Sequence, residues 1–79
     1  MPWRNVLGAH LREMTPEQAL ASLRRIQMRI GIAEQPEVCR LTDLPPYRIT
    51  PFVISQVCEK LAKVAGLHIH KFDPTEQVD

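Results

Sequence analysis

Two stretches of the chain carry the same start and stop signals for a helix, at the same spacing. The first frame consists of Thr15, Pro16 and Gly31, and the second consists of Thr50, Pro51 and Gly66. A threonine can cap a helix, a proline at the first helical position sacrifices no hydrogen bond, and a glycine can take the left-handed conformation that ends the helix. The frames therefore predict two helices of equal length. Shared capping signals explain the match better than an internal repeat, because stacked repeats need about three units to bury a continuous core.

The first half of the chain predicts two amphipathic helices. Before the first frame, the apolar residues that fall on one helical stripe are Trp3, Val6, Leu7, Leu11 and Met14. Within residues 16–30, the inward positions are Ala19, Leu23, Ile26 and Ile30. Residues 26–32 also alternate as a strand would, but Gln18 completes a capping box with Thr15 and so favours a helix.

Prolines divide the second half of the chain. Pro36 is expected to open a short helix over residues 36–44, and Pro45-Pro46 must end it because a residue that precedes proline is pushed out of the helical region. Residues 45–49 are then expected to be extended. The helix over residues 51–65 has inward positions at Ile54, Val57, Cys58, Leu61 and Ala65, with Ile49 as a hydrophobic staple against Ile54. Residues 67–72 alternate as a short strand does.

The 79 residues, 44% of them hydrophobic, suffice for one core. We therefore expect a mainly α, single four-helix domain over residues 1–72 with a short C-terminal β-strand, followed by a disordered polar tail at residues 73–79. A domain this small often gains stability by pairing, so a homodimer or a partner-bound form is expected. Two cysteines are too few for a disulfide framework, and no apolar run is long enough to cross a membrane, which favours a reduced, cytoplasmic protein.

The net charge of +1 is distributed unevenly along the chain. Residues 1–33 carry five arginines and two glutamates, whereas residues 34–79 carry five basic and seven acidic residues. Such asymmetry can mark an interaction face, although solvated helix faces also differ in charge. The outward arginines of the second predicted helix are Arg24, Arg25 and Arg29.

Residues with catalytic or metal-binding chemistry do not form a recognisable set. His68 and His70 would share a face of a strand, with Cys58 or Asp73 as further ligands, but the set is incomplete for zinc. Cys58 lies on an apolar helical stripe, where desolvation disfavours the reactive thiolate. The chain also lacks a glycine-rich phosphate loop and a serine elbow. We therefore expect no enzymatic activity, no cofactor and no metal.

Residues 38–72 resemble part of a winged helix-turn-helix domain. The similarity consists of a short helix at residues 41–44, a turn, a second helix that begins Thr50-Pro51-Phe52-Val53 and a Gly66-Leu67 step. The resemblance implies a recognition helix at residues 51–65 whose solvent side carries Ser55, Gln56, Lys60 and Lys63. Serine and glutamine can contact base edges, and lysine can contact phosphate.

Two kinds of binding partner fit these observations. The first is DNA, which would make the protein a transcriptional regulator that uses Ser55, Gln56, Lys60 and Lys63 together with the arginines of residues 24–29. The alternative is a partner protein, bound by an interaction module or an anti-activator, because Glu59 and the acidic second half oppose phosphate. In that case the expected contact residues are Trp3, Leu7, Leu11, Pro46 and Tyr47.

Overall fold

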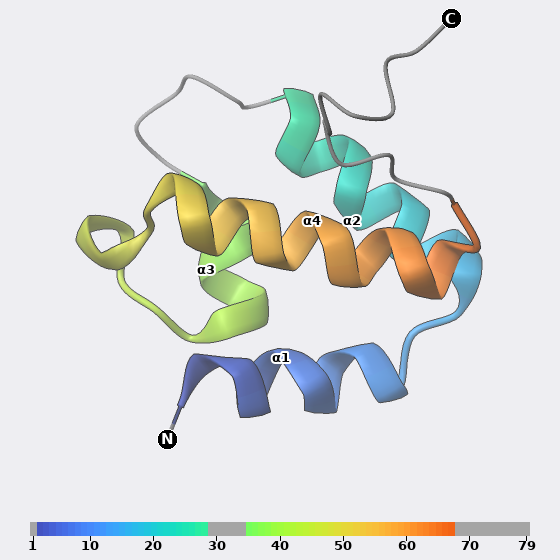
Figure 1. The fold of residues 1–79 in the computed structure, drawn as a ribbon, viewed down its shortest axis with the longest axis horizontal. Coiled ribbons are helices and arrows are strands. Elements are labelled where there is room, and N and C mark those ends of the chain that lie inside the picture. Colours follow the sequence, from blue (N-terminus) through green and yellow to red (C-terminus); the bar gives the residue numbers. More distant parts are fainter. Residues whose placement is uncertain (1, 29–34, 68–79) are drawn as a thin grey trace, which may run out of the picture.

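Four α-helices and one 3₁₀ helix make up the described part of the chain, residues 2–28 and 35–67 of a computed structural model (Figure 1). They are α1 (Trp3–Arg12), α2 (Pro16–Met28), α3 (Pro36–Thr42), the 3₁₀ helix η1 (Pro46–Arg48) and α4 (Pro51–Ala65). The mainly helical fold is thus confirmed. Of the predicted strand at residues 67–72, only Leu67 is described, and it lies in no strand. The predicted tail at residues 73–79 lies outside the described residues.

The capping signals act as the sequence predicts at three of the four frame ends. At the start of α2, the Thr15 amide donates to Gln18 Oε1 at 3.0 Å and the Gln18 amide donates to Thr15 Oγ1 at 3.2 Å. At the start of α4, the Val53 amide donates to Thr50 Oγ1 at 3.2 Å. Gly66 ends α4 at a φ of 77°, in the left-handed region that favours glycine. Gly31 lies outside the described residues.

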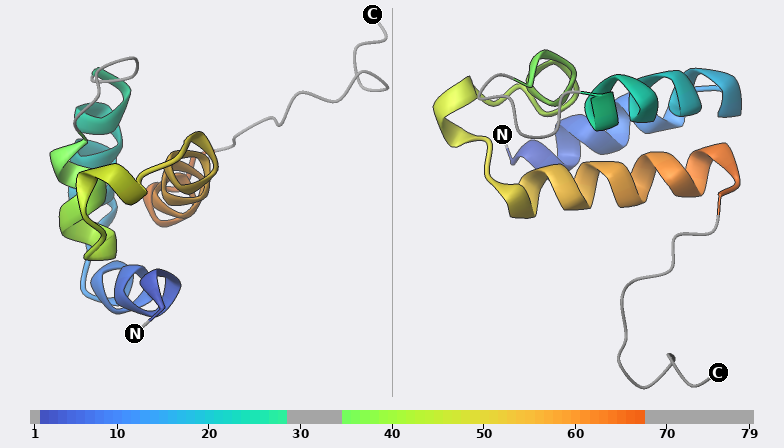
Figure 2. Two further views of the ribbon diagram at one scale, coloured as in Figure 1. Left: turned by 90° about the vertical axis from the view of Figure 1, so that its left-hand side faces the viewer. Right: turned by 90° about the horizontal axis from the view of Figure 1, so that it is seen from above.

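The core lies between all four α-helices. α2 and α4 make the most extensive contact and run in opposite directions, while α1 lies against α3 and α4 (Figures 1 and 2). The buried apolar residues are Leu7, Ala19, Leu23, Ile26, Val38, Leu41, Val53, Val57, Leu61 and Ala62. Within α1, Leu7 is the one fully buried residue. α1 therefore contributes fewer buried residues than any of the other three α-helices.

The expectation that residues 45–49 are extended was wrong for the middle of that segment. The Arg48 amide donates to the Pro45 carbonyl at 2.9 Å, and the Ile49 amide donates to the Pro46 carbonyl at 3.1 Å, which closes the turn of η1. Pro46 opens this turn because its fixed φ suits a 3₁₀ helix and its missing N–H has no partner to lose. Pro45 is extended, at a φ of −70° and a ψ of 158°, because it precedes another proline.

The end of α3 and the buried face of α4 also differ from the prediction. α3 ends at Thr42, before the prolines, because Asp43 takes the left-handed conformation at a φ of 59°. In α4, Val53 and Ala62 are buried, whereas Ile54 and Cys58 are half-buried. The fully buried row Val53, Val57 and Leu61 has the same four-residue spacing as the neighbouring row that starts at Ile54. Periodicity alone does not distinguish two adjacent rows of this kind.

Gly8 occupies the middle of α1 without any structural need for glycine. A Cβ atom added at Gly8 would meet no heavy atom within 4 Å. Glycine in a helix interior costs stability because its backbone loses more conformational entropy than that of alanine. We predict that Gly8→Ala raises the free energy of unfolding by about 0.5–1 kcal/mol. Urea denaturation followed by circular dichroism measures the change, and an unchanged or lowered stability would contradict this account of α1.

Candidate functional site

A groove of about 250 Å³ runs between α1 and α4. Its lining residues are Trp3, Arg4, Leu7, Gly8, Leu11, Gln56 and Lys60. The first five come from α1, where spacings of three and four residues place them on one face, and the last two lie one turn apart on α4. Most of the exposed lining surface is apolar. The groove therefore has an apolar floor and a polar, basic edge.

Three apolar side chains of α1 line the groove without filling it. Leu7 is 3% exposed and belongs to the core, while Trp3 and Leu11 are half-buried and pack against the core from its edge. Gly8 has no side chain, and apart from its chain neighbours and the helix backbone no heavy atom lies within 4 Å of the place where its Cβ atom would be, so the space beside the helix backbone is open. The depth of the groove thus depends on Gly8.

Arg4 is held at one end of the groove by two aromatic rings. Its guanidinium carbon lies 4.7 Å from the centre of the Trp3 ring and 5.8 Å from the centre of the Phe52 ring. Both distances are within the range of a cation–π interaction, which orients the side chain while leaving its charge available. Phe52 is 57% exposed and extends the apolar surface beyond the groove.

The groove carries positive charge. Arg4 and Lys60 are both exposed, and no residue that lines the groove in the described part of the chain has a carboxylate. A negatively charged group placed at the groove edge would therefore find two cations and no opposing acid in the lining. The site can therefore bind a ligand by burying apolar surface and by pairing with its negative charge.

The structure joins two sets of residues that the sequence assigned to different partners. Trp3, Leu7 and Leu11, expected to contact a protein, line the same groove as Gln56 and Lys60, expected to contact DNA. Sequence reasoning missed Arg4 and Gly8, although both lie at helical spacing from Leu7 and Leu11 and this spacing was the available signal.

The remaining sequence-predicted residues lie elsewhere. Ser55 and Lys63 are exposed on α4 but do not line the groove, and Arg24 is exposed on α2. Pro46 and Tyr47 belong to η1, where Tyr47 is 84% exposed. Arg29 lies outside the described residues.

Arg25 takes part in an ion-pair cluster around Glu37. The Glu37 carboxylate accepts hydrogen bonds from Arg40 Nε at 3.0 Å and Arg40 Nη2 at 2.9 Å, and it lies 3.4 Å from Arg25 Nη1. Hydrogen bonding from Arg40 lowers the pKa of Glu37 to about 2, with a further contribution from the buried Ser22 hydroxyl, against an opposing effect of burial. This cluster ties α2 to α3, so part of the predicted basic face is already neutralised.

The cluster around Glu37 predicts a dependence of stability on pH. Because the pKa of Glu37 is lower in the folded chain than its ordinary value of 4.5, the stabilisation is complete above about pH 4.5 and disappears as the pH falls towards 2. We expect about 1 kcal/mol, since Arg25 and Arg40 are 64% and 53% exposed and water screens the pairs.

Glu37→Gln provides the matched control for this pH effect. The variant should lose about 1 kcal/mol at neutral pH and little more on acidification, because its side chain carries no charge to titrate. Urea denaturation at a series of pH values measures both chains. Parallel curves for the two chains between pH 5 and 2 would show that Glu37 does not supply the effect.

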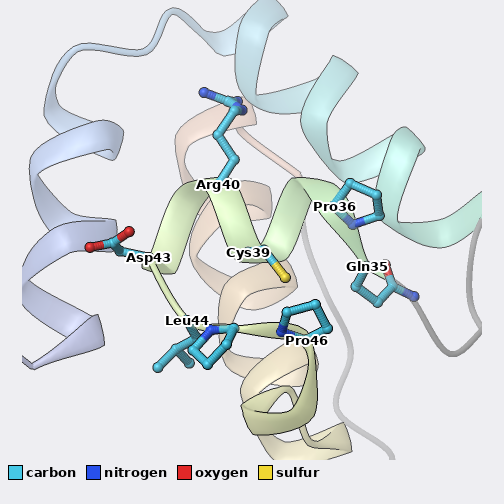
Figure 3. Close-up of a pocket in the computed structure, with 8 residues that line it drawn as sticks. Gln35, Pro36, Cys39, Arg40, Asp43, Leu44 and Pro46 are labelled. Atoms are coloured by element: carbon cyan, nitrogen blue, oxygen red, sulfur yellow. The ribbon is translucent and has the colours of Figure 1, made fainter.

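A second, wider hollow of about 680 Å³ lies on α3 and the turn after it (Figure 3). Pro36, Cys39, Leu44, Pro45 and Pro46 give it an apolar wall, and Arg40 and Asp43 are its ionisable residues. The cysteine at its centre is a free thiol. No histidine or second nucleophile from the described residues lines it, so it does not gather catalytic groups.

The described residues also gather no metal-ligand set. No group of three or more histidine, cysteine, aspartate or glutamate side chains lies close enough together in residues 2–28 and 35–67 to hold an ion. The remaining residues of the metal alternative, His68, His70 and Asp73, lie outside that part of the chain. Burial raises the pKa of the Cys58 thiol, which makes the unreactive protonated form dominant.

Comparisons with known proteins identify no relative of this chain, so the functional proposal has to be argued from the groove. No family model matches the chain, and no curated protein or solved structure is significantly similar to it. Within the described ranges, none of the helices is long and apolar enough to cross a membrane.

Proposed function

We propose that this protein is a non-enzymatic regulator that acts by binding a partner protein in the groove between α1 and α4. The observation that carries the proposal is the groove itself, in which half-buried Trp3 and Leu11 lie beside the cationic Arg4 and Lys60. Aromatic residues and arginine are enriched where protein partners bind most strongly, because they bury a large area and still make polar contacts. Exposed Phe52 enlarges the same surface.

The helix-turn-helix-like interpretation fits this role as a scaffold. The order of α3, a turn and α4 supports it, while the chief packing partner of α4 is α2 and the turn contains η1. A helix-turn-helix-like scaffold can present the exposed face of α4 to a protein as well as to DNA. The free Cys39 and Cys58 suit a reduced compartment such as the cytoplasm.

DNA remains a second candidate because one observation favours it. Ser55, Lys60 and Lys63 are all exposed on α4, as a reading helix requires. Against it, the net charge of the chain is only +1, and the apolar lining of the groove has no use in contacts with phosphate. We therefore place the partner protein first.

Site-specific photo-crosslinking tests the proposed function. A photoreactive amino acid at Gln56, which lines the groove, should yield a discrete crosslinked polypeptide in the cells from which the sequence comes. The same amino acid at Glu17, which is exposed on α2, is the control and should yield none. Equal labelling at both positions, or none at Gln56, would remove the proposal.

A DNA-binding measurement separates the two candidates. We expect no binding of a random-sequence duplex tighter than about 10⁻⁴ M at physiological salt, since few phosphates could be neutralised. If binding is instead tight and falls steeply with salt, the double variant Lys60→Ala with Lys63→Ala should flatten that slope. That outcome, measured by fluorescence anisotropy, would replace the partner protein with DNA.

A further inference from the structure

We propose that the occupant of the groove between α1 and α4 is an acidic amphipathic helix of the partner protein. This inference rests on the proposed function and names the chemistry of the partner. It depends on three features of the groove, namely its charge, its repeat and the glycine in its floor.

The charge of the groove selects the charge of the occupant. Arg4 and Lys60 are exposed at its edge, and its lining in the described part of the chain contains no carboxylate. An aspartate or glutamate on either flank of a bound helix would meet a cation, whereas a lysine there would meet only like charge. Arg4 is already oriented in part by the rings of Trp3 and Phe52, so it has less side-chain freedom to lose on binding.

The spacing of the apolar residues in the groove favours a helix as its occupant. Its apolar residues Trp3, Leu7 and Leu11 are spaced four residues apart along α1, over a length of about 12 Å at 1.5 Å per residue. A partner helix that lies along the groove presents its own apolar side chains at the same repeat, which is the usual way a helix binds in a groove. The volume of about 250 Å³ accommodates the anchoring side chains of such a helix and lies below the range of about 300–1,000 Å³ that is usual for small-molecule pockets.

Gly8 marks the position of closest approach. Glycine weakens α1, its backbone is not in the left-handed region, and no neighbouring atom within 4 Å requires a missing side chain. Glycine at this position also leaves open space in the groove floor, where an anchoring side chain can come close to the backbone of α1. A large side chain at this position would occupy part of that space.

A second copy of this chain fits the groove less well than an acidic helix. Two grooves that face each other across a twofold axis would bring Arg4 and Lys60 of one copy near the same residues of the other. Those like charges repel. We therefore expect the predicted homodimer to use another surface.

Peptide selection on the 79-residue chain tests this assignment. Random peptides of about 16 residues, displayed on phage, are selected against the immobilised chain, and the enriched sequences are synthesised with a fluorescent label. We expect enriched peptides to be net acidic, with leucine or aromatic anchors at i, i+4 and i+7. Fluorescence anisotropy then gives their affinity for the wild-type chain and its variants.

The variants place the peptide in the groove. Gly8→Leu fills the floor and should weaken binding by about thirtyfold, while Ala9→Leu adds the same side chain at the exposed neighbouring position and should change it less than about twofold. Arg4→Glu with Lys60→Glu should weaken binding at least tenfold, and repeating the selection on this double variant should enrich basic peptides. Arg48→Glu, exposed on η1 and outside the groove lining, is the charge control. Circular dichroism confirms that each variant is folded.

Several results would overturn the inference. Enriched peptides that are neutral or basic, or that bind Gly8→Leu as tightly as wild type, would remove the acidic helix. A wild-type chain that sediments as a dimer and a Gly8→Leu chain that sediments as a monomer would assign the groove to a second copy. A chain shortened after Leu67 that binds peptides more than about tenfold tighter would assign it to the carboxyl-terminal segment of the protein itself. If crosslinking at Gln56 still captures a different polypeptide, the proposed function stands and only the chemistry assigned to the occupant is wrong. If the only crosslinked species is a second copy or the chain itself, the proposed function is wrong as well.

Discussion

The packing of α2 against α4 is the interaction on which the rest of the structure depends. These two helices supply seven of the ten buried apolar residues, namely Ala19, Leu23, Ile26, Val53, Val57, Leu61 and Ala62. Each starts at a threonine cap, so the residue at which each helix begins is fixed by a local hydrogen bond. α3 adds the buried Val38 and Leu41, contacts both α1 and α2, and is joined to α2 outside the core by the ion pair between Glu37 and Arg25.

This arrangement leaves α1 in a different position from the other helices. It is anchored in the core through Leu7, and its remaining large apolar residues, Trp3 and Leu11, are half-buried. A helix that buried all three would pack flush against α4 and leave no groove between them. The groove is therefore a consequence of a helix, α1, that lies against α3 and α4 but contributes only Leu7 to the fully buried core.

Sequence reasoning found the helices because their ends carry local signals, and it was less reliable wherever the answer depended on packing. The caps at Thr15, Thr50 and Gly66 involve neighbours within a few residues, so they can be read directly from the chain. Which row of α4 faces α2, and whether Pro46 starts a turn or continues an extended segment, depends on distant residues. The candidate site was predicted as two unrelated sets for the same reason, because the proximity of Trp3 to Lys60 arises only when α1 lies beside α4.

α1 contains features that lower its helical stability, and packing within the fold does not explain them. α1 has ten residues, no side-chain cap at Pro2 and a glycine in its middle, all of which disfavour a helix of this length. In α2 and α4 the local signals agree with the fold, as the caps of both helices show. A local choice that opposes the fold, at a position where a larger residue would meet no obstacle, is typical of a functional site. Gly8 lies in the floor of the groove beside the cations of its edge, so the conflict and the candidate site coincide. The glycine that lowers the stability of α1 is thus the same residue that leaves the groove open for a helix of a partner protein.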